Sequence, residues 1–350
     1  MLAITLADLR MRSRQFLIAV VGAGLVFSIA LLLTGMVSGF DNEIDRTVES
    51  ADADGWVIPK GTSGPFTAVR GISGSTVDKL AADKGVEDAS GMVISLQTVL
   101  TDSAAPARIM MIGAGVDKRG QVTADEGSEV RRHNEAVVDR RLKLDLGETF
   151  VLAGREFKVV GLVEGMTMLG GTPDVWISLK AAQRALFRGQ DLVTTVVVTG
   201  EPEKLPQGLV LMSRAQVETD SLGPMRDAVS SVNSTKYLMW SVAAVIVAAL
   251  IYVSALQRTR DFAVLKAVGA SSLSLFLGVA IQAVVVTLAA AAFALAASKF
   301  MLPLYSVPVE VPVSAYLMMP VIAVGVALLS SLVALRQAVK ADPALAFGGS

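Results

Sequence analysis

Four long stretches of this chain contain no charged residue, and they limit what it can fold into. They run over Phe16–Phe40, Leu238–Leu256, Leu273–Ser298 and Val313–Leu335. Each reaches the roughly 20 residues that an α-helix needs to cross the hydrocarbon core of a bilayer. One such stretch could be a buried helix of a soluble protein, but four with charged flanks favour a membrane protein. We therefore predict four transmembrane helices, whose backbones satisfy their own hydrogen bonds.

The first stretch follows three arginines, which is also how a cleaved signal peptide begins. Its apolar run covers Phe16–Phe40, which is longer than the roughly 7–15 residues of a signal-peptide core. Gly39, Phe40 and Asp41 stand where a small-x-small cleavage site would be expected. We therefore predict a retained span.

Flanking charges predict the orientation of the helices. Basic residues gather before the first span, between the second and third, and after the fourth: Arg10, Arg12, Arg14, Arg258, Arg260, Lys266, Arg336 and Lys340. Acidic residues follow the first span directly, at Asp41, Glu43 and Asp45. Because loops rich in Lys and Arg stay in the cytoplasm, we predict cytoplasmic termini and a large extracytoplasmic segment after the first span.

The predicted layout has nine parts. They are a cytoplasmic amphipathic helix (1–14), a first span (15–40), an extracytoplasmic α+β domain (41–236), a second span (237–256), a cytoplasmic helix (257–272), a third span (273–300), a short extracytoplasmic loop (301–312), a fourth span (313–335) and a cytoplasmic tail (336–350).

The long segment after the first span mixes α and β patterns. Two β-rich runs within Glu148–Glu164 flank Ala153-Gly154 and predict a hairpin. Ser75 and Asp78 predict the start of a helix through a capping box, and Ser178–Phe187 predicts a second helix. Further predicted strands are Met92–Leu100, Arg108–Gly113, Asp174–Ser178 and Leu192–Val198, and residues 117–135 are predicted to form a polar loop.

Composition excludes several kinds of chemistry. The chain has no cysteine and one histidine, His133, so one subunit cannot build a disulfide or a site of several His and Cys ligands. It has no G-x-x-x-x-G-K-[ST] phosphate loop, and its net charge of -1 is not the footprint of a nucleic-acid-binding protein. Uncharged spans argue against an ion channel, a proton-coupled carrier and a membrane protease. We identify no catalytic residue, cofactor-binding residue or metal ligand, and interpret His133 as a solvated side chain.

Polar and small residues in the spans predict helix packing. Gln282, Thr287 and Ser298 in the third span favour hydrogen bonding between helices over ligand binding. Gly22, Gly24 and the cluster Ala289–Ala292 are predicted to be close-packing surfaces, within the subunit or between two copies. Trp56 and Trp176 are interpreted as packing residues.

Two predicted cytoplasmic segments have amphipathic patterns. In the N-terminal segment, Leu2, Leu6 and Leu9 share one helical face and Arg10 follows, which suits a helix at the membrane surface. Between the second and third spans, Phe262, Leu265 and Lys266 share a face, and Gly269 is placed to end the helix. This second helix predicts a docking surface for a cytoplasmic partner. The alternatives are a plain turn or a helix anchored in lipid.

Three segments resemble those of a known family. Residues 257–271 read QRTRDFAVLKAVGAS, which resembles the signature loop E-R-x-R-E-x-A-V-L-K-A-[IVL]-G-A of FtsX-like/MacB-type permeases. Residues 336–346 (RQAVKADPALA) are similar to that family's closing segment, and residues 138–149 with 157–163 to its extracytoplasmic core. Gln257 and Asp261 replace glutamates of the family pattern. The order of one span, a large domain and three spans also resembles the short, stand-alone DevC-like permeases.

The resemblance implies that the chain is the permease of a type VII ABC transporter in a bacterial plasma membrane. The permease would be a homodimer, and two copies of a separate cytosolic ATPase would bind ATP and Mg²⁺. It implies an extracytoplasmic domain of MacB periplasmic-core type. In this family the loop between spans 2 and 3 and the N-terminal helix contact the ATPase. The corresponding residues here are Arg258, Arg260, Phe262, Leu265, Lys266 and Gly269 in the loop, and Leu2, Leu6, Leu9 and Arg10 in the N-terminal helix.

Three functions remain open at this stage. The first is export or extraction of an amphipathic or lipid-like cargo by mechanotransmission, and the second is cargo-free control of an extracytoplasmic protein, as in FtsX. A sensor or receptor is the third. Import of a small polar solute, such as an amino acid, is disfavoured because no span offers a polar binding site.

Overall fold

The computed structural model describes residues 13–67, 69–101, 104–116, 118–257, 259–305 and 307–340. Within them, four helices are long and apolar enough to span a membrane. The chain divides into two compact units, which we call the helical unit (Met1–Ser38 and Val229–Ser350) and the sheet unit (Gly39–Ala228). The predicted N-terminal amphipathic helix, with Leu2, Leu6, Leu9 and Arg10, lies outside the described residues.

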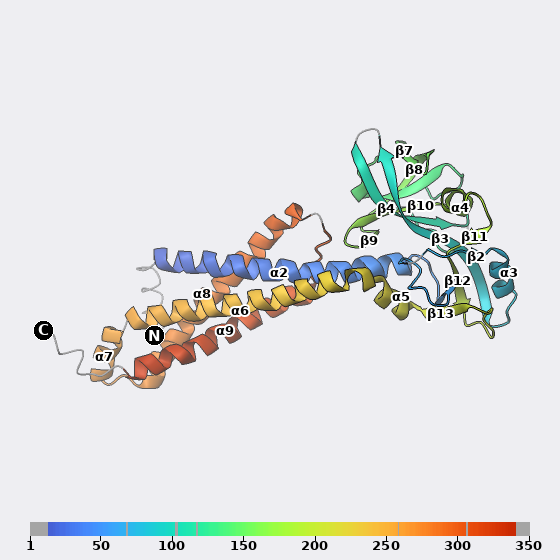
Figure 1. The fold of residues 1–350 in the computed structure, drawn as a ribbon. Helices are drawn as coiled ribbons and strands as arrows, with labels where there is room; N and C mark the ends of the chain where they lie inside the picture. Colours follow the sequence, from blue (N-terminus) through green and yellow to red (C-terminus); the bar gives the residue numbers. More distant parts are fainter. Residues whose placement is uncertain are drawn as a thin grey trace. The chain divides into compact units, whose positions relative to one another are not determined.

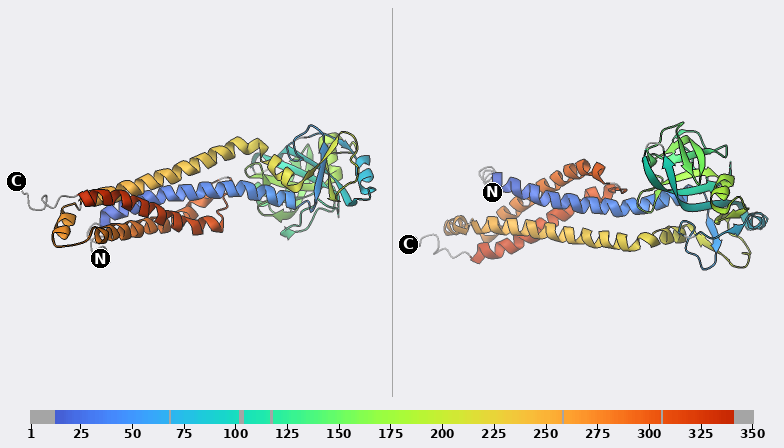
Figure 2. Two further views of the ribbon diagram at one scale, coloured as in Figure 1. Left: turned by 90° about the horizontal axis from the view of Figure 1, so that it is seen from below. Right: turned by 45° about the horizontal axis from the view of Figure 1, so that its top comes forward.

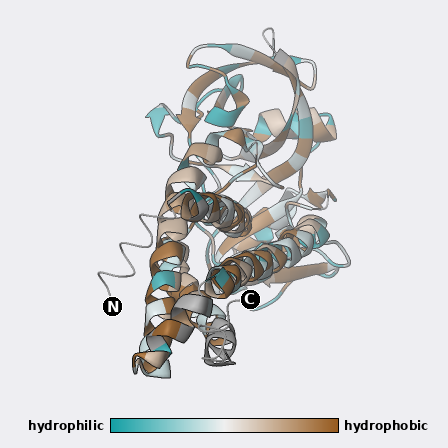
Figure 3. Cartoon of the chain, turned by 90° about the vertical axis from the view of Figure 1, so that its left-hand side faces the viewer, coloured by the Kyte–Doolittle hydropathy of each residue, from teal (hydrophilic) through white to brown (hydrophobic). Residues whose placement is uncertain are grey.

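The described helical unit is a bundle of long helices with one short helix (Figure 1). Its elements are α2 (Ser13–Glu49, of which residues 13–38 belong here), α6 (Arg226–Gln257), α7 (Thr259–Ala267), α8 (Ser272–Met301), the 3₁₀ turn η3 (Leu302–Leu304) and α9 (Val313–Lys340). α8 and α9 lie side by side (Figure 2). Hydrophobic residues, brown in Figure 3, occur along these helices.

Small residues allow close packing inside the bundle. A Cβ added to Gly24 of α2 would lie 2.6 Å from Phe293 Cδ1 and 2.9 Å from the carbonyl oxygen of Ala290 in α8, so the two helices approach too closely for any side chain there. Gly22 has open space instead. Both glycines were predicted to be close-packing positions, and within this subunit Gly24 is a close contact whereas Gly22 is not.

Polar groups in the bundle find partners on the helices. The Gln282 amide of α8 donates to the Ser254 hydroxyl of α6 at 2.9 Å, which confirms the predicted link between helices. Thr287 and Ser298 instead donate to carbonyls of their own helix, those of Ala283 and Leu295. For these two residues the prediction of interhelical bonds is wrong, because a hydroxyl within a helix reaches the carbonyl three or four residues earlier.

The sheet unit is built on one large mixed sheet with the path β13-β1-β12-β3-β4-β10-β6-β8-β5. β7 joins β3 and β8, β9 joins β10, and β11 and β2 form a separate pair. The strands are β1 (Gly55–Pro59), β2 (Ile72–Ser73), β3 (Val86–Thr101), β4 (Ala104–Ala114), β5 (Glu126–Gly127), β6 (Glu135–Asp139), β7 (Thr149–Leu152), β8 (Arg155–Val163), β9 (Thr167–Met168), β10 (Thr172–Ser178), β11 (Leu192–Val193), β12 (Thr195–Gly200) and β13 (Leu209–Ser213).

Helices cover both faces of this sheet. α3 (Ser75–Ala81) and α4 (Leu179–Phe187) pack on one face with Val93 and Met111. The last turns of α2 and helix α5 (Arg214–Ser221) pack on the other, where Ile44 and Val217 join the core around Met110. Neighbouring residues of β4 therefore point into different cores, which explains why this strand is apolar without alternation. Short 3₁₀ turns η1 (Arg140–Leu142) and η2 (Gly223–Met225) complete the unit.

Local signals predicted several of these elements. β7 and β8 form the expected hairpin, and Ala153 and Gly154 at its turn both have positive φ, 50° and 75°. α4 begins after Ser178, whose hydroxyl accepts from the Ala181 N–H. The capping box predicted at Ser75 is wrong: the N-cap of α3 is Gly74, no side chain caps the helix, and the Ser75 hydroxyl contacts that of Ser73 instead.

Candidate functional site at the C-terminal end of helix α2

Glu43 is a buried carboxylate on α2 within the sheet unit, with 1% of its surface exposed. It accepts hydrogen bonds from the N–H groups of Gly170 at 2.6 Å and Gly171 at 2.9 Å, and from the Thr167 hydroxyl at 2.8 Å. Leu169, Gly170 and Gly171 all have positive φ, of 54°, 80° and 95°, in the turn between β9 and β10. Consecutive N–H groups in such turns form an anion-binding concavity. Glu43 occupies this one, and so attaches α2 to the sheet.

Thr47 lies one helical turn beyond Glu43 and contacts Asp174 of β10. Its hydroxyl is 2.7 Å from Asp174 Oδ2 and 3.4 Å from the carbonyl oxygen of Thr167. Burial raises the pKa of Asp174 well above its ordinary value; the Thr47 hydrogen bond opposes this, and the charges of Asp139 and Glu43 add to it. The Thr47 hydroxyl is the donor in its bond to Asp174, and so favours the ionised carboxylate against the effect of burial.

Asp139, at the end of β6, is the third buried carboxylate of this region. It accepts from the Arg141 N–H at 2.9 Å and from the Met166 N–H at 2.8 Å. Burial raises the pKa of Asp139, while these two hydrogen bonds and the charge of Arg141 lower it. Its bond to Met166 positions the start of the segment 166–171, which supplies the hydrogen-bond donors to Glu43. Within the described chain, no group of acidic or histidine side chains has the arrangement of a metal site.

An ion-pair network on the more exposed side of α2 makes a further attachment. The guanidinium of Arg214, at the start of α5, lies 2.5 Å from Asp45, 2.8 Å from Glu218 and 3.7 Å from Glu49. Exposed pairs are each worth only about 0–1 kcal/mol. The buried Glu43 bonds are therefore the stronger attachment, and the exposed Arg214 network is the weaker one.

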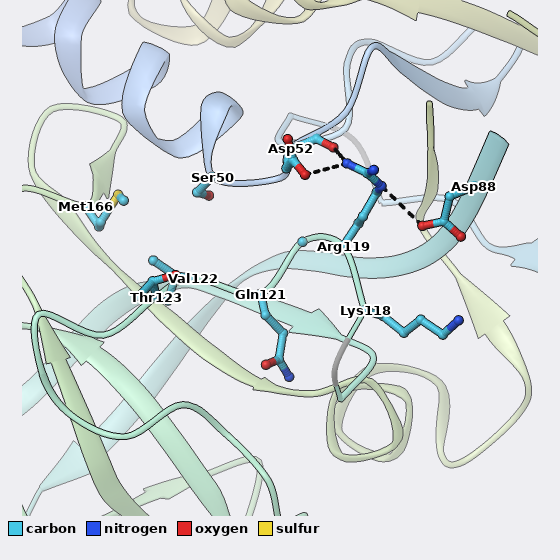
Figure 4. A pocket seen from close by; sticks show the side chains of 10 residues that line it. Ser50, Asp52, Asp88, Lys118, Arg119, Gln121, Val122, Thr123 and Met166 are labelled. Atoms are coloured by element: carbon cyan, nitrogen blue, oxygen red, sulfur yellow. Dashed lines mark hydrogen bonds and ion pairs between the residues drawn. The ribbon is translucent and has the colours of Figure 1, made fainter. Parts of the chain in front are cut away.

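An open cleft of about 720 Å³ lies just beyond the end of α2 (Figure 4). Arg119 crosses it, with its guanidinium 2.5 Å from Asp52 and 3.2 Å from Asp88, and Figure 4 shows Lys118 pointing away from this pair. Its lining is Ser50, Asp52, Asp88, Lys118, Arg119, Gly120, Gln121, Val122, Thr123 and Met166. Arg119 pairs with both acidic side chains of the lining, and so links the chain just after α2 to β3. The lining residues do not form a pair of nucleophile and base.

The residues predicted to contact a partner fall in and around α7. Phe262 is 5% exposed and belongs to the core of the helical unit, so its side chain holds α7 in place and is not on the surface. Among the described side chains, Val264 of α7 is 49% exposed and Val268, just after the helix, is 84% exposed, and the sequence pattern did not single out either. Gly269 has a φ of 99° just after the helix, as expected of a terminating glycine.

The other residues predicted to contact the partner in this loop are Arg258, Arg260, Leu265 and Lys266. Lys266 is half-buried. Arg258 lies outside the described residues, and the side chains of Arg260 and Leu265 lie outside the described part as well.

Comparison with known proteins identifies the family. Residues 16–209 match the MacB-like periplasmic core domain, and residues 235–343 match the FtsX-like permease C-terminal domain. An uncharacterized ABC transporter permease of Mycobacterium bovis is 35% identical over 349 residues, 100% of each chain. Another, from Mycobacterium tuberculosis strain H37Rv, is 34% identical over the same length and coverage. This chain belongs to the MacB- and FtsX-like ABC transporter permeases.

Two solved structures are similar to part of the permease. The periplasmic region of MacB from Actinobacillus actinomycetemcomitans has 12% identity and a TM-score of 0.36, covering 47% of this chain and 91% of that one. The extracellular domain of the noncanonic ABC-type transporter YknZ from Gram-positive bacteria has 12% identity and a TM-score of 0.33, covering 46% and 99%.

Each of the two family matches covers one of the candidate sites. The MacB-like match covers α2 from residue 16 onward and so includes Glu43, and the FtsX-like match includes α7.

Proposed function

We propose that this permease is a lever of the type VII kind, which passes motion from a separate cytosolic ATPase to the sheet unit. Two copies would pair in a bacterial plasma membrane, with both termini and α7 in the cytoplasm and the sheet unit outside. Two ATPase subunits, with ATP and Mg²⁺, would supply the energy. The cargo would be amphipathic or lipid-like, exported or extracted at the outer side of the membrane.

The observation that carries this proposal is the attachment of α2. One unbroken helix, Ser13–Glu49, contains the first uncharged stretch and ends in the sheet unit, where Glu43 is buried in the Gly170–Gly171 turn. A helix bound by several charge-assisted hydrogen bonds can push or tilt a domain, whereas a loosely linked helix cannot. The uncharged spans agree with this proposal, since a lever needs no polar permeation route.

The decisive experiment measures motion and hydrolysis separately. The chain has no native cysteine, so a single cysteine at exposed Glu129 can carry a spin label on each copy. The full permease with its ATPase in nanodiscs is expected to change its label–label distance when ATP is trapped with vanadate. Glu43→Ala should abolish the change while ATP hydrolysis continues, and the exposed Glu201→Ala should preserve it. An unchanged distance in the wild-type protein, or a full change in Glu43→Ala, would refute the lever.

The cargo-free alternative is tested with the same preparation. Stimulation of ATP hydrolysis by a short-chain lipid or lipopeptide supports transport. Stimulation that requires an extracytoplasmic protein, with no response to amphiphiles, supports signalling like that of FtsX.

A further inference from the structure

A second cleft of the sheet unit, of about 510 Å³, is lined by arginines from three separate elements. Arg132 lies in the loop before β6, Arg155 begins β8 and Arg184 lies in α4. The remaining lining is His133, Asn134, Glu156, Phe157 and Ala181. The lining therefore contains three arginines and one acidic residue, Glu156, so these side chains give the cleft a net positive charge.

The side chains of two of these arginines have no partner in the fold. Among the described residues, the guanidinium groups of Arg155 and Arg184 make no hydrogen bond or ion pair. Arg132 has a single distant contact, 3.8 Å to Glu135, and its side chain is exposed. Glu135 itself accepts hydrogen bonds from the backbone N–H groups of Arg131 and Arg132. Guanidinium groups without a protein partner keep their hydrogen-bond donors available to a ligand.

His133 is a further polar side chain of the cleft. Its Nδ1 lies 3.1 Å from the hydroxyl of the buried Ser178, which also accepts from the Ala181 N–H at the start of α4. The start of α4 also places the positive end of its helix dipole at the cleft. Phe157 and Ala181 are buried and form an apolar floor.

We propose that this cleft binds a phosphoryl group, carried by a lipid headgroup or by a soluble phosphate ester. A guanidinium group can donate two parallel N–H bonds to two oxygens of one phosphate. A phosphoryl group has more acceptor oxygens than a carboxylate, so it suits three guanidinium groups better as a ligand. The apolar floor accommodates the carbon next to the phosphoryl group. The site is separate from the attachment of α2 and needs no ATPase.

The test is calorimetric titration of the full chain in a non-ionic detergent. The probes are inorganic phosphate and monomeric dihexanoyl-phosphatidylglycerol. We expect saturable binding in the wild-type protein and a loss of about tenfold in affinity for Arg155→Ala or Arg184→Ala. Arg184→Lys should also lose affinity, because an ammonium keeps the charge but not the paired geometry. The exposed Arg70→Ala is the matched control and should bind normally.

Glu156→Gln gives a gain that misfolding cannot imitate, because removing the one acidic lining residue should raise the affinity several-fold. Tighter binding of the lipid identifies a headgroup as the source, and equal binding identifies a soluble phosphate ester. The proposal is overturned if neither probe saturates, if Arg155→Ala and Arg184→Ala bind like Arg70→Ala, or if Arg184→Lys binds like the wild type.

Discussion

Glu43 of α2 accepts the backbone N–H of Gly170 at 2.6 Å, although 127 positions separate the two residues in the chain. This bond joins the helix that contains the first uncharged stretch to the turn between β9 and β10. The donors in that turn face Glu43 because three successive residues have positive φ. The carboxylate and the turn therefore depend on each other for hydrogen bonding.

Removing the Glu43 carboxylate should destabilise the sheet unit. Glu43→Ala leaves the N–H groups of Gly170 and Gly171 and the Thr167 hydroxyl without their acceptor, at a cost of about 2–5 kcal/mol. Thermal unfolding of the detergent-solubilised chain measures the effect. The exposed Glu129→Ala should unfold like the wild type, and equal melting temperatures for the two variants would contradict the assignment.

Gly170 should resist substitution more than a glycine in open space. Its φ is 80°, and an added Cβ would lie 2.9 Å from Met225 Cε. Gly170→Ala should therefore cost about 1–3 kcal/mol, chiefly left-handed backbone strain, with a smaller part from displacing the flexible end of the Met225 side chain. Gly154, with a φ of 75° and nothing within 4 Å, is the control for strain alone. A Gly154→Ala variant as unstable as Gly170→Ala would remove the steric part of this account.

Asp174 should make stability fall as pH rises. Its pKa is raised above the ordinary 3.8, so the folded state holds a proton that the unfolded state releases. Stability is therefore greatest below the ordinary value and declines, by up to about 1.4 kcal/mol per pH unit for one proton, until pH passes the raised pKa. Asp139 has a pKa raised in the same direction and contributes to the same trend.

Asp174→Asn isolates the contribution of this one group. The amide stays neutral, so above the ordinary carboxyl pKa of 3.8 the melting temperature should depend less on pH than that of the wild type, and it should be the higher of the two once the pH passes the raised pKa of Asp174. A variant that keeps the full pH dependence of the wild type would assign the effect to Asp139 or to other groups.

The contact of α2 with α8 should tolerate no side chain at Gly24. Gly24→Leu would force Phe293 and the Ala290 carbonyl apart, at a cost of about 1–3 kcal/mol. Gly22→Leu, two residues away with open space around it, should be nearly neutral. Size-exclusion chromatography and melting temperature in detergent compare the two, and similar losses would place the close contact elsewhere.

The surface of α7 gives a test of the proposed ATPase contact. Val264→Asp with Val268→Asp alters only exposed apolar side chains and should weaken co-purification with the ATPase by about tenfold or more, without changing the melting temperature. Phe262→Asp should instead destabilise the helical unit, because Phe262 is buried there. Normal ATPase binding by the doubly substituted chain would show that the contact does not use this surface.

The sequence by itself determined the elements that local physics controls. Uncharged stretches as long as a bilayer is thick predict helices, because no water is present there to satisfy a backbone. The hairpin at Ala153-Gly154 and the helix after Ser178 follow from turn and cap chemistry within a few residues. The family pattern at residues 257–271 was equally local, and the family assignment is confirmed.

Only the tertiary structure decided which polar side chains act together. Glu43 is, in the sequence, one of three acidic residues after the first span, and nothing nearby distinguishes it from Asp41 or Asp45. Its partners, Thr167 and the Gly170–Gly171 turn, lie more than 120 positions away. The burial of Phe262 was not predictable for the same reason, since helical periodicity defines a face but not what that face contacts. Burial depends on distant segments meeting in the fold, which no local pattern encodes.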